Sequence, residues 1–192
     1  MNPELQTNRQ TLPPADAQAH NETRSRPANA QYPANGQRPA IELYTDGASS
    51  GNPGPGGYGI VLKCAGKRLE LSGGYSLTTN NRMELLAVIR GLEAIKWQNA
   101  EVHVWSDSSY VVNAINKGWL EGWKMKGFAK VKNPDLWKRL VPLLSSHRVA
   151  FHWIKGHAGH PENERCDRLA VAAGAGAVAA GKELSPDPGY EG

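Results

Sequence analysis

YTDGASSGNPGPGGYG, residues 44–59, combines the end of an alternating apolar run with a segment rich in glycine and proline. The alternation in IELYTD predicts a strand that ends at Asp46, and the glycines and prolines predict a reversal of the chain. A phosphate-binding loop, G-x-x-x-x-G-K-[ST], would need a lysine and a following helix, and this stretch has neither. We therefore predict a hairpin with a carboxylate at the rim of a sheet.

The segments that follow extend this hairpin. YGIVLK and KRLELSGGY flank the turn residues Ala65 and Gly66, which predicts a third strand in succession. The stretch NNRMELLAVIRGLEAIKW, residues 80–97, then changes to apolar residues at helical spacing behind a Thr/Asn start signal. The sequence thus predicts a three-stranded meander followed by a helix.

The second half of the chain alternates strands with helices. We expect strands in EVHVWSD (101–107) and VAFHWI (149–154), and helices in SSYVVNAIN (108–116), NPDLWKRLVPLL (133–144) and PENERCDRLAVAA (161–173). Pro142 should kink or end the second of these helices, whereas Pro161 suits the first turn of the third. Strands and helices that alternate after a meander predict an α/β fold with a mixed sheet covered by helices.

The 192 residues suit one domain with terminal extensions, because 40% apolar content is enough for a core. Residues 1–39 hold six of the thirteen prolines and almost no large aliphatic residues, which predicts a disordered N-terminal arm. From Ala173 onward the glycines and prolines argue against a continued helix. We expect the folded domain at 40–174 and a flexible C-terminal tail at 175–192.

The charge and the cysteines indicate the class of protein. The net charge of +4 and the pI near 9.1 favour a polyanionic partner. Cys64 and Cys166 lie far apart in a chain without a secretory leader, which predicts two free thiols in a reducing compartment. No apolar run approaches the roughly 20 residues needed to cross a bilayer. We expect a soluble, cytoplasmic protein without membrane contact.

Four acidic residues occupy positions suited to a shared site. Asp46 and Asp107 come at the ends of predicted strands, where open α/β sheets place ligand groups. Glu84 lies in the first turn of the first predicted helix, and Asp167 lies one turn into the last. Each position alone has an ordinary explanation in helix dipoles or turn chemistry. Together they predict a divalent-metal site made of oxygen ligands.

His157 lies between glycines in the loop KGHAGH, where an imidazole is suited to proton transfer. The alternative is a solvated loop histidine without a function. His157, His160 and Cys166 also raise the possibility of a zinc site, but their spacing fits no paired-ligand pattern.

Residues 115–140, here called the basic segment, contain seven lysines and arginines against two acids. Trp119, Trp123, Phe128 and Trp137 are interleaved with these charges. The aromatic residues could belong to the core beneath a solvated basic face. The three glycines of the segment favour instead a protrusion that contacts nucleic acid.

Five blocks of this sequence resemble the successive motifs of type 1 ribonuclease H, in the order and at about the spacing of that family. The blocks are YTDGASSGNPGPGGYG, TTNNRMELLAVI, WSDSSYVVNAI, NPDLWKRL and WIKGHAGHPENERCDRLA, and the resemblance covers residues 40–174. It implies the ribonuclease H-like fold, a five-stranded mixed sheet with three antiparallel strands and then parallel strands. It also implies hydrolysis of the RNA strand of RNA–DNA hybrids, leaving 3′-hydroxyl and 5′-phosphate ends.

The resemblance also implies roles for individual residues. Asp46, Glu84, Asp107 and Asp167 match the metal-binding and catalytic carboxylates of the family, and His157 matches its catalytic histidine. The residues that match nucleic-acid-binding positions are Asn52, Thr79, Asn80, Asn81, Trp119, Trp123, Lys124, Lys126, Phe128, Lys130 and Asn133. Thr79 and Asn133 match a pocket for a DNA phosphate, and the basic segment matches a protrusion that grips the DNA strand.

The sequence departs from the family pattern at two places. Phe128 stands where better-known members carry Trp, and the chain is a few residues shorter after it. Ser109 replaces a frequent glutamine. The implied cofactors are two Mg²⁺ ions with substrate bound, or Mn²⁺ in their place, with no organic cofactor, and the implied state is a monomer.

Two other functions remain open at this stage. A related two-metal DNA nuclease or polynucleotidyl transferase would share the strand-end acids. A non-catalytic hybrid-binding module would use the basic segment alone, although the four acids argue against it.

Overall fold

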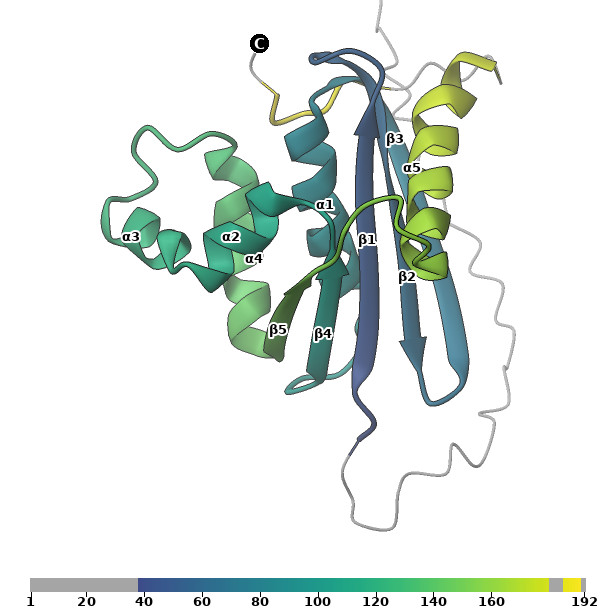
Figure 1. Ribbon diagram of the computed structural model, residues 1–192. Helices are drawn as coiled ribbons and strands as arrows, with labels where there is room; N and C mark the ends of the chain where they lie inside the picture. Colours follow the sequence, from purple (N-terminus) through teal and green to yellow (C-terminus); the bar gives the residue numbers. More distant parts are fainter. Residues whose placement is uncertain (1–37, 180–184, 191–192) are drawn as a thin grey trace, which may run out of the picture. The chain divides into compact units, whose positions relative to one another are not determined.

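The computed structural model describes residues 38–179 and 185–190. Its centre is a five-stranded sheet with the strand order β3-β2-β1-β4-β5 (Figure 1). The strands are β1 (Ile41–Ser49), β2 (Gly54–Cys64), β3 (Lys67–Thr78), β4 (Glu101–Ser106) and β5 (Arg148–Trp153). The first three strands pair antiparallel, and β4 and β5 join β1 in parallel. This confirms the predicted five-stranded mixed sheet.

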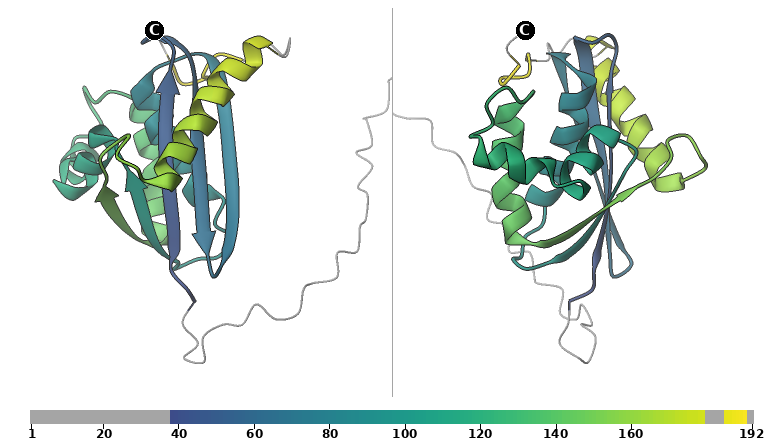
Figure 2. Two further views of the ribbon diagram at one scale, coloured as in Figure 1. Left: turned by 45° about the vertical axis from the view of Figure 1, so that its right-hand side comes forward. Right: turned by 60° about the vertical axis from the view of Figure 1, so that its left-hand side comes forward.

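Helices cover both faces of the sheet (Figure 2). The helices α1 (Asn80–Glu93), α2 (Ser109–Asn116), α3 (Trp119–Met125) and α4 (Pro134–Ser146) lie on one side, and α5 (Pro161–Ala179) lies alone on the other. The helix α1 packs on β1 and β2, and α4 packs on α1. The helix α5 lies over β1, β2 and β3, which leaves β4 and β5 without a helix on that side.

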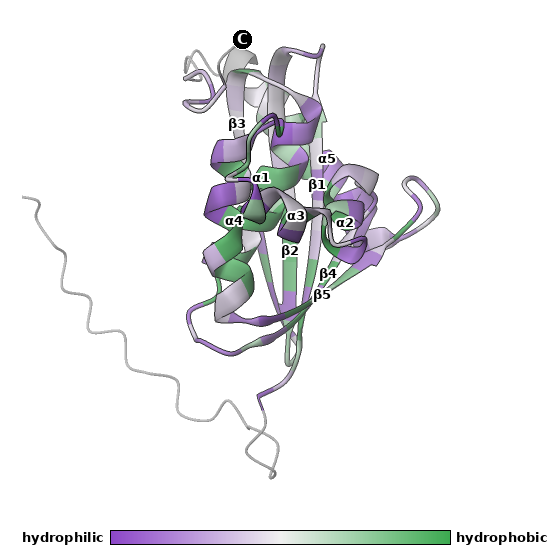
Figure 3. Ribbon diagram, turned by 90° about the vertical axis from the view of Figure 1, so that its left-hand side faces the viewer, coloured by the Kyte–Doolittle hydropathy of each residue, from purple (hydrophilic) through white to green (hydrophobic). Residues whose placement is uncertain are grey.

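The core lies between the sheet and α1, and α4 packs against α1 and adds buried side chains to this core. Leu43 and Val104 from the sheet, Leu85 and Ile89 from α1, and Trp137 from α4 are completely buried. The ribbon of α4 changes between hydrophilic and hydrophobic residues along its length, as expected for a helix with one buried face (Figure 3). Burial of these apolar side chains is the main force that fixes α1 and α4 on the sheet.

The close approach of α5 to the sheet depends on the glycines of β2. A Cβ atom on Gly59 would lie 2.0 Å from the carbonyl oxygen of Cys166 on α5. Any side chain at this position would therefore push the helix away from the strand. We interpreted the glycines of residues 44–59 as turn residues, and the structure shows that Gly59 serves helix packing in the middle of β2.

The predicted end of α5 at Ala173 was wrong, since the helix continues to Ala179. The small residues that argued against a helix are those that a helix in direct contact with a strand requires. A Cβ atom on Gly174 would lie 3.0 Å from the carbonyl carbon of Gly56. This packing stabilises a helical turn whose intrinsic propensity is poor.

Pro142 does not end α4, which continues to Ser146. The side chains of Leu136, Trp137 and Leu140 hold the helix against the core on the N-terminal side of the proline. On its C-terminal side the hydroxyl of Ser146 donates a hydrogen bond of 2.8 Å to the carbonyl of Pro142. Burial of one face offsets the loss of the backbone hydrogen bond that Pro142 cannot donate.

Within the described residues, no helix has the length and the apolar content needed to span a membrane. The longest of them, α5, carries charged residues throughout its first two turns.

Candidate metal and nucleic-acid site

Three acidic side chains from three elements converge at one end of the sheet. Asp46 of β1, Glu84 of α1 and Asp107 after β4 each offer a carboxylate oxygen, and these oxygens lie within 4.8 Å of one another. Asp46 and Glu84 are each 7% exposed. Three carboxylates at this separation form a set of oxygen ligands for a hard divalent cation.

The register of the sheet explains why the two aspartates meet. Thr45 of β1 lies opposite Ser106 of β4 in the parallel pair, so the next residue of each strand is an aspartate at the same edge. Parallel strands end together at their carboxyl ends, which is where such folds place ligand groups. The structure brings Asp46 and Asp107 together at this edge, but the predicted end of the strand at Asp46 was wrong, since β1 continues to Ser49 and stays paired with β2.

Gly47 allows α1 to bring Glu84 to this rim. A Cβ atom on Gly47 would lie 2.2 Å from the backbone nitrogen of Glu84. The residue after Asp46 must therefore lack a side chain for the first turn of α1 to contact β1.

The three acids of the cluster repel one another and are buried, which disfavours their charged forms. Burial, and then the charge of Asp107, raises the pKa of Asp46 to about 7. Burial, and then the charge of Asp46, also raises the pKa of Glu84 well above its usual value. The Oε2 atom of Glu84 is buried without a hydrogen-bond partner. A buried, unpartnered carboxylate oxygen beside two further acids fits a bound cation.

Asp167, the fourth predicted ligand, lies outside this group of three. It is half-buried on α5, and its charge contributes to the raised pKa of Asp46, after burial and the larger effect of Asp107. Its negative charge therefore acts on the same site. Its role as a metal ligand stays a prediction.

Asn163 belongs to this site, although we did not predict it from the sequence. It is 2% exposed, and its Nδ2 donates a hydrogen bond of 3.2 Å to Oδ2 of Asp107. Asn163 lies four residues before Asp167, which places both on one face of α5. That spacing was the available signal, but an asparagine in a first helical turn has many ordinary explanations.

His157 lies in the loop between β5 and α5, exposed and with a positive φ of 51°. This position leaves its imidazole free of protein partners among the described residues, as a group that meets substrate would be. The zinc alternative finds no support in residues 38–179 and 185–190, where the metal-binding cluster consists of the three acids. Cys166 is completely buried beneath β2, and this burial raises the pKa of its thiol.

The predicted minor-groove residues lie beside the acids. The backbone N–H of Asn80 donates to Oδ1 of Asn52 over 3.3 Å, which joins the β1–β2 loop to the start of α1. The Nδ2 atom of Asn80 lies 3.4 Å from Oε1 of Glu84. Thr79 precedes α1 as its N-cap, and Asn81 is exposed. Asn52, Thr79, Asn80 and Asn81 thus form one polar surface next to Glu84.

Asn133 lies before α4 in the left-handed conformation, with a φ of 57°. Its Nδ2 donates a hydrogen bond of 3.2 Å to the hydroxyl of Tyr110, and its Oδ1 accepts one of 3.4 Å from Arg82. These two bonds fix the side-chain amide in one orientation.

The aromatic residues of the basic segment divide between core and surface. Trp123 packs edge-on against the buried Trp137, with 5.2 Å between the ring centroids, and Phe128 also contacts the core. Trp119 is 44% exposed, and the ammonium of Lys117 lies 5.3 Å from its ring centroid. The core interpretation of this segment therefore holds for Trp123, Phe128 and Trp137. The surface interpretation holds for Trp119.

The lysines of the basic segment point to solvent. Lys124, Lys126 and Lys130 are all exposed. Lys124 pairs with Glu121 over 3.0 Å, one turn earlier on α3. Most of the positive charge of this segment is therefore available to a polyanion.

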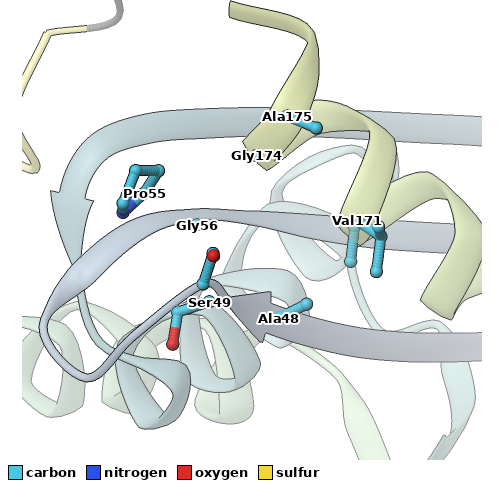
Figure 4. Close-up of a pocket in the computed structure, with 9 residues that line it drawn as sticks. Ala48, Ser49, Pro55, Gly56, Val171, Gly174 and Ala175 are labelled. Atoms are coloured by element: carbon cyan, nitrogen blue, oxygen red, sulfur yellow. The ribbon is translucent and has the colours of Figure 1, made fainter. Parts of the chain in front are cut away.

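An apolar pocket lies on the α5 side of the sheet, apart from the acids (Figure 4). Ala48 and Ser49 of β1, Gly56 of β2, and Val171 and Ala175 of α5 line it. It contains none of the carboxylates. This pocket is therefore separate from the acidic cluster.

Comparison with known proteins agrees with this arrangement. A family model described as RNase H matches residues 38–175. The chain is 60% identical over 138 residues to a ribonuclease H of Desulforamulus reducens, which covers 69% of this chain and 86% of the relative. It also resembles LC9-RNase H1, a type 1 RNase H with the type 2 active-site motif, with a TM-score of 0.67, 31% identity and 80% of both chains covered. The structure of LC11-RNase H1 in complex with RNA/DNA hybrid matches with a TM-score of 0.54 and 32% identity, over 72% of this chain and 99% of that one.

Proposed function

The chain belongs to the ribonuclease H family, and from this premise we propose how its residues hydrolyse the RNA strand of RNA–DNA hybrids. The observation that carries the proposal is the convergence of Asp46, Glu84 and Asp107 at one rim of the sheet. This function is the one that the resemblance implied. A divalent metal ion is the cofactor that the family and the acidic cluster support.

We propose Mg²⁺ as the ion, because the ligands offered are carboxylates and Mg²⁺ prefers oxygen. Asp46, Glu84 and Asp107 would hold the metal, with Asp167 as a further ligand. When bound, two such ions supply an activated water and neutralise the leaving oxygen of a phosphodiester. Products with 3′-hydroxyl and 5′-phosphate ends follow from attack of water on phosphorus with departure of the 3′ oxygen.

The remaining residues bind and orient the hybrid. Asn52, Asn80 and Asn81 face the shallow minor groove, where the 2′-hydroxyl groups of RNA are displayed. Thr79 and Asn133 hold a phosphate of the DNA strand. Trp119, Lys126 and Lys130, with the rest of the basic segment, contact that strand further along. His157 moves a proton at the departing oxygen or eases release of the product. In this proposal the protein acts as a monomer, so one chain supplies all of these groups.

The test compares four substrates of identical sequence: an RNA–DNA hybrid, single-stranded RNA, duplex RNA and duplex DNA, each with Mg²⁺ and with EDTA. We expect cleavage of the RNA strand of the hybrid only, and only with the metal. Cleavage of duplex DNA would favour the DNA nuclease or transferase alternative. Binding of hybrid without cleavage at any Mg²⁺ concentration would favour the non-catalytic module.

A further inference from the structure

A buried ionic cluster lies beside the proposed phosphate-binding residues. Arg82, in the first turn of α1, is 2% exposed, and Asp187 is 5% exposed. Arg82 donates from Nη2 to Oδ1 of Asp187 over 3.0 Å and from Nε to its Oδ2. It also donates to both carboxylate oxygens of Asp135, over 3.0 and 2.7 Å. A guanidinium held by two carboxylates in this way has a single orientation.

Asp187 comes from the C-terminal segment Ser185–Tyr190, which lies against the edge strand β3. The backbone N–H of Asp187 donates to the carbonyl of Leu77 over 3.1 Å, and that of Ser76 donates to the carbonyl of Ser185 over 3.2 Å. The hydroxyl of Thr78 donates to Oδ2 of Asp187 over 2.9 Å. Part of the predicted flexible tail therefore contacts the domain, immediately before Thr79.

Gly189 lies in close contact with the side chains of Arg82 and Asp135. A Cβ atom on Gly189 would lie 2.1 Å from Oδ2 of Asp135 and 2.7 Å from Nη2 of Arg82. The backbone N–H of Gly189 also donates to Oδ1 of Asp187 over 3.3 Å. A side chain at position 189 would therefore displace the ends of the Arg82 and Asp135 side chains.

The cluster is connected to the proposed phosphate pocket through Arg82. Its Nη1 donates to Oδ1 of Asn133 over 3.4 Å, and this bond leaves the Nδ2 of Asn133 facing Tyr110. The bonds to Arg82 and Tyr110 are the side-chain hydrogen bonds that orient the amide of Asn133. A change in the position of Arg82 would therefore change the position of Asn133.

We propose that Asp187 is a positioning residue for nucleic-acid binding, which orients Asn133 through Arg82 and holds Thr79 through Thr78. The inference rests on the proposed function, in which Thr79 and Asn133 hold a DNA phosphate. Asp187 lies behind Arg82 and does not touch the substrate. The C-terminal segment thus determines how tightly the hybrid is held, and the acids of the metal site are not part of the cluster.

The experiment compares the full-length parent with Asp187→Ala, Asp187→Asn, Gly189→Ala and Asn133→Ala. Ser185→Ala, which changes an exposed side chain of the same segment, is the matched control. For each protein we would measure the melting temperature, the Mg²⁺ dependence, KM and kcat on hybrid, and the Kd for hybrid in EDTA. Hybrids in which single DNA phosphates are replaced by neutral methylphosphonates would locate the phosphate that the pocket binds.

We expect Asp187→Ala to raise KM and Kd about tenfold, with kcat and the Mg²⁺ dependence within about twofold of the parent. Gly189→Ala and Asn133→Ala should behave alike, Asp187→Asn should lie between parent and Asp187→Ala, and Ser185→Ala should match the parent. The methylphosphonate that weakens the parent most should have little further effect on Asp187→Ala.

A fall in melting temperature with unchanged KM and Kd would show that Asp187 only stabilises the fold and would overturn the proposal. A lower KM for Asp187→Ala would also overturn the proposal. It would show that removing a negative charge near the polyanionic hybrid affects binding more than the orientation of Asn133 does. If Asp187→Ala does not fold, Asp187→Asn and Gly189→Ala give the same test. If the parent binds hybrid but does not cleave it, the proposed function fails while the Kd values still test Asp187.

Discussion

At the scale of single residues, the acidic cluster places carboxylates where burial and mutual repulsion disfavour their charged forms. Asp46 is buried, and the structure supplies it with one hydrogen bond, of 2.7 Å, from the backbone of Gly47. Burial and the charge of Asp107 shift the pKa of Asp46 from 3.8 to about 7. Between these two pH values the folded protein binds a proton that the unfolded chain has lost. The stability therefore falls as the pH rises from about 4 to 7.

We predict that Asp46→Asn abolishes hybrid cleavage and raises the stability of the metal-free protein at pH 8. The neutral amide removes a penalty on the order of 2–4 kcal/mol, since each pKa unit corresponds to about 1.4 kcal/mol. At pH 4 parent and variant should be nearly equally stable. Chemical denaturation in EDTA at the two pH values, with cleavage assays in Mg²⁺, checks both parts.

Two results would contradict this prediction. Cleavage within about tenfold of the parent would mean that Asp46 is not an essential metal ligand. An equal effect on stability at pH 4 and pH 8 would mean that the change acts through packing and not through charge. Asn163→Ala is a suitable comparison, because it alters a neighbour of Asp107 without removing an acid.

His157 should behave differently from the acids. We predict that His157→Ala lowers kcat by about 10² or less, the usual size of a contribution from general acid–base catalysis. The Mg²⁺ dependence should change little, because a hard cation prefers oxygen ligands. Mg²⁺ titrations and the pH–rate profile of both proteins would be measured. A large shift of the Mg²⁺ curve would instead assign His157 to the metal.

At the scale of elements, the basic segment and the acidic cluster lie on different helices and strands. Its lysines are exposed around α3, while Trp123 and Phe128 connect this region to Trp137 in the core. The acids lie on β1, α1 and the end of β4, which are separate elements. Changes of charge in the basic segment should therefore leave the metal site intact.

We predict that replacing Lys124, Lys126 and Lys130 together with alanine raises KM for hybrid and leaves kcat nearly unchanged. Each phosphate contact that is lost should reduce the slope of log KM against log salt by about one. Steady-state kinetics at several salt concentrations measure both quantities. Lys67→Ala, at an exposed position in the β2–β3 hairpin, is the matched control. The same KM and slope in the triple variant and the parent would assign these lysines to a solvated face.

At the scale of the whole molecule, the residues that the structure describes contain the core, the acidic cluster and the basic segment. Arg38 and Pro39 at their start already contact the domain. The guanidinium of Arg38 lies 5.7 Å from the ring centroid of Trp97, and the carbonyl of Pro39 accepts a hydrogen bond from Cys64.

We predict that deletion of residues 1–37 leaves hybrid cleavage largely unchanged. The melting temperature should change by no more than about 5 °C, which corresponds to about 1 kcal/mol for a domain of this size. The reason is the composition of the arm, which offers few large apolar side chains for burial. Thermal denaturation and cleavage assays of the two chains check this. A larger drop would show that the arm docks on the domain, and its proposed limits at 1–39 would need to change.

Several features of the fold were predictable from the sequence because they are local. The alternation in residues 41–46 and the helical spacing after Asn80 indicated β1 and α1, and the family motifs indicated which acids meet. The hydrophobic period and the motif spacing are properties of neighbouring residues, so they can be recognised without the tertiary structure.

The sequence by itself determined the order of the five strands and of every helix except α3 (Trp119–Met125), together with the acids Asp46, Glu84 and Asp107. The tertiary structure alone decided the contact of Asn163 with Asp107, the packing of α5 on Gly59, and the attachment of Asp187 to Arg82. Asn163 and Asp107 are 56 residues apart, and Asp187 and Arg82 are 105 apart. Such contacts leave no local pattern, because their stability comes from burial and charge pairing that exist only once the chain has folded.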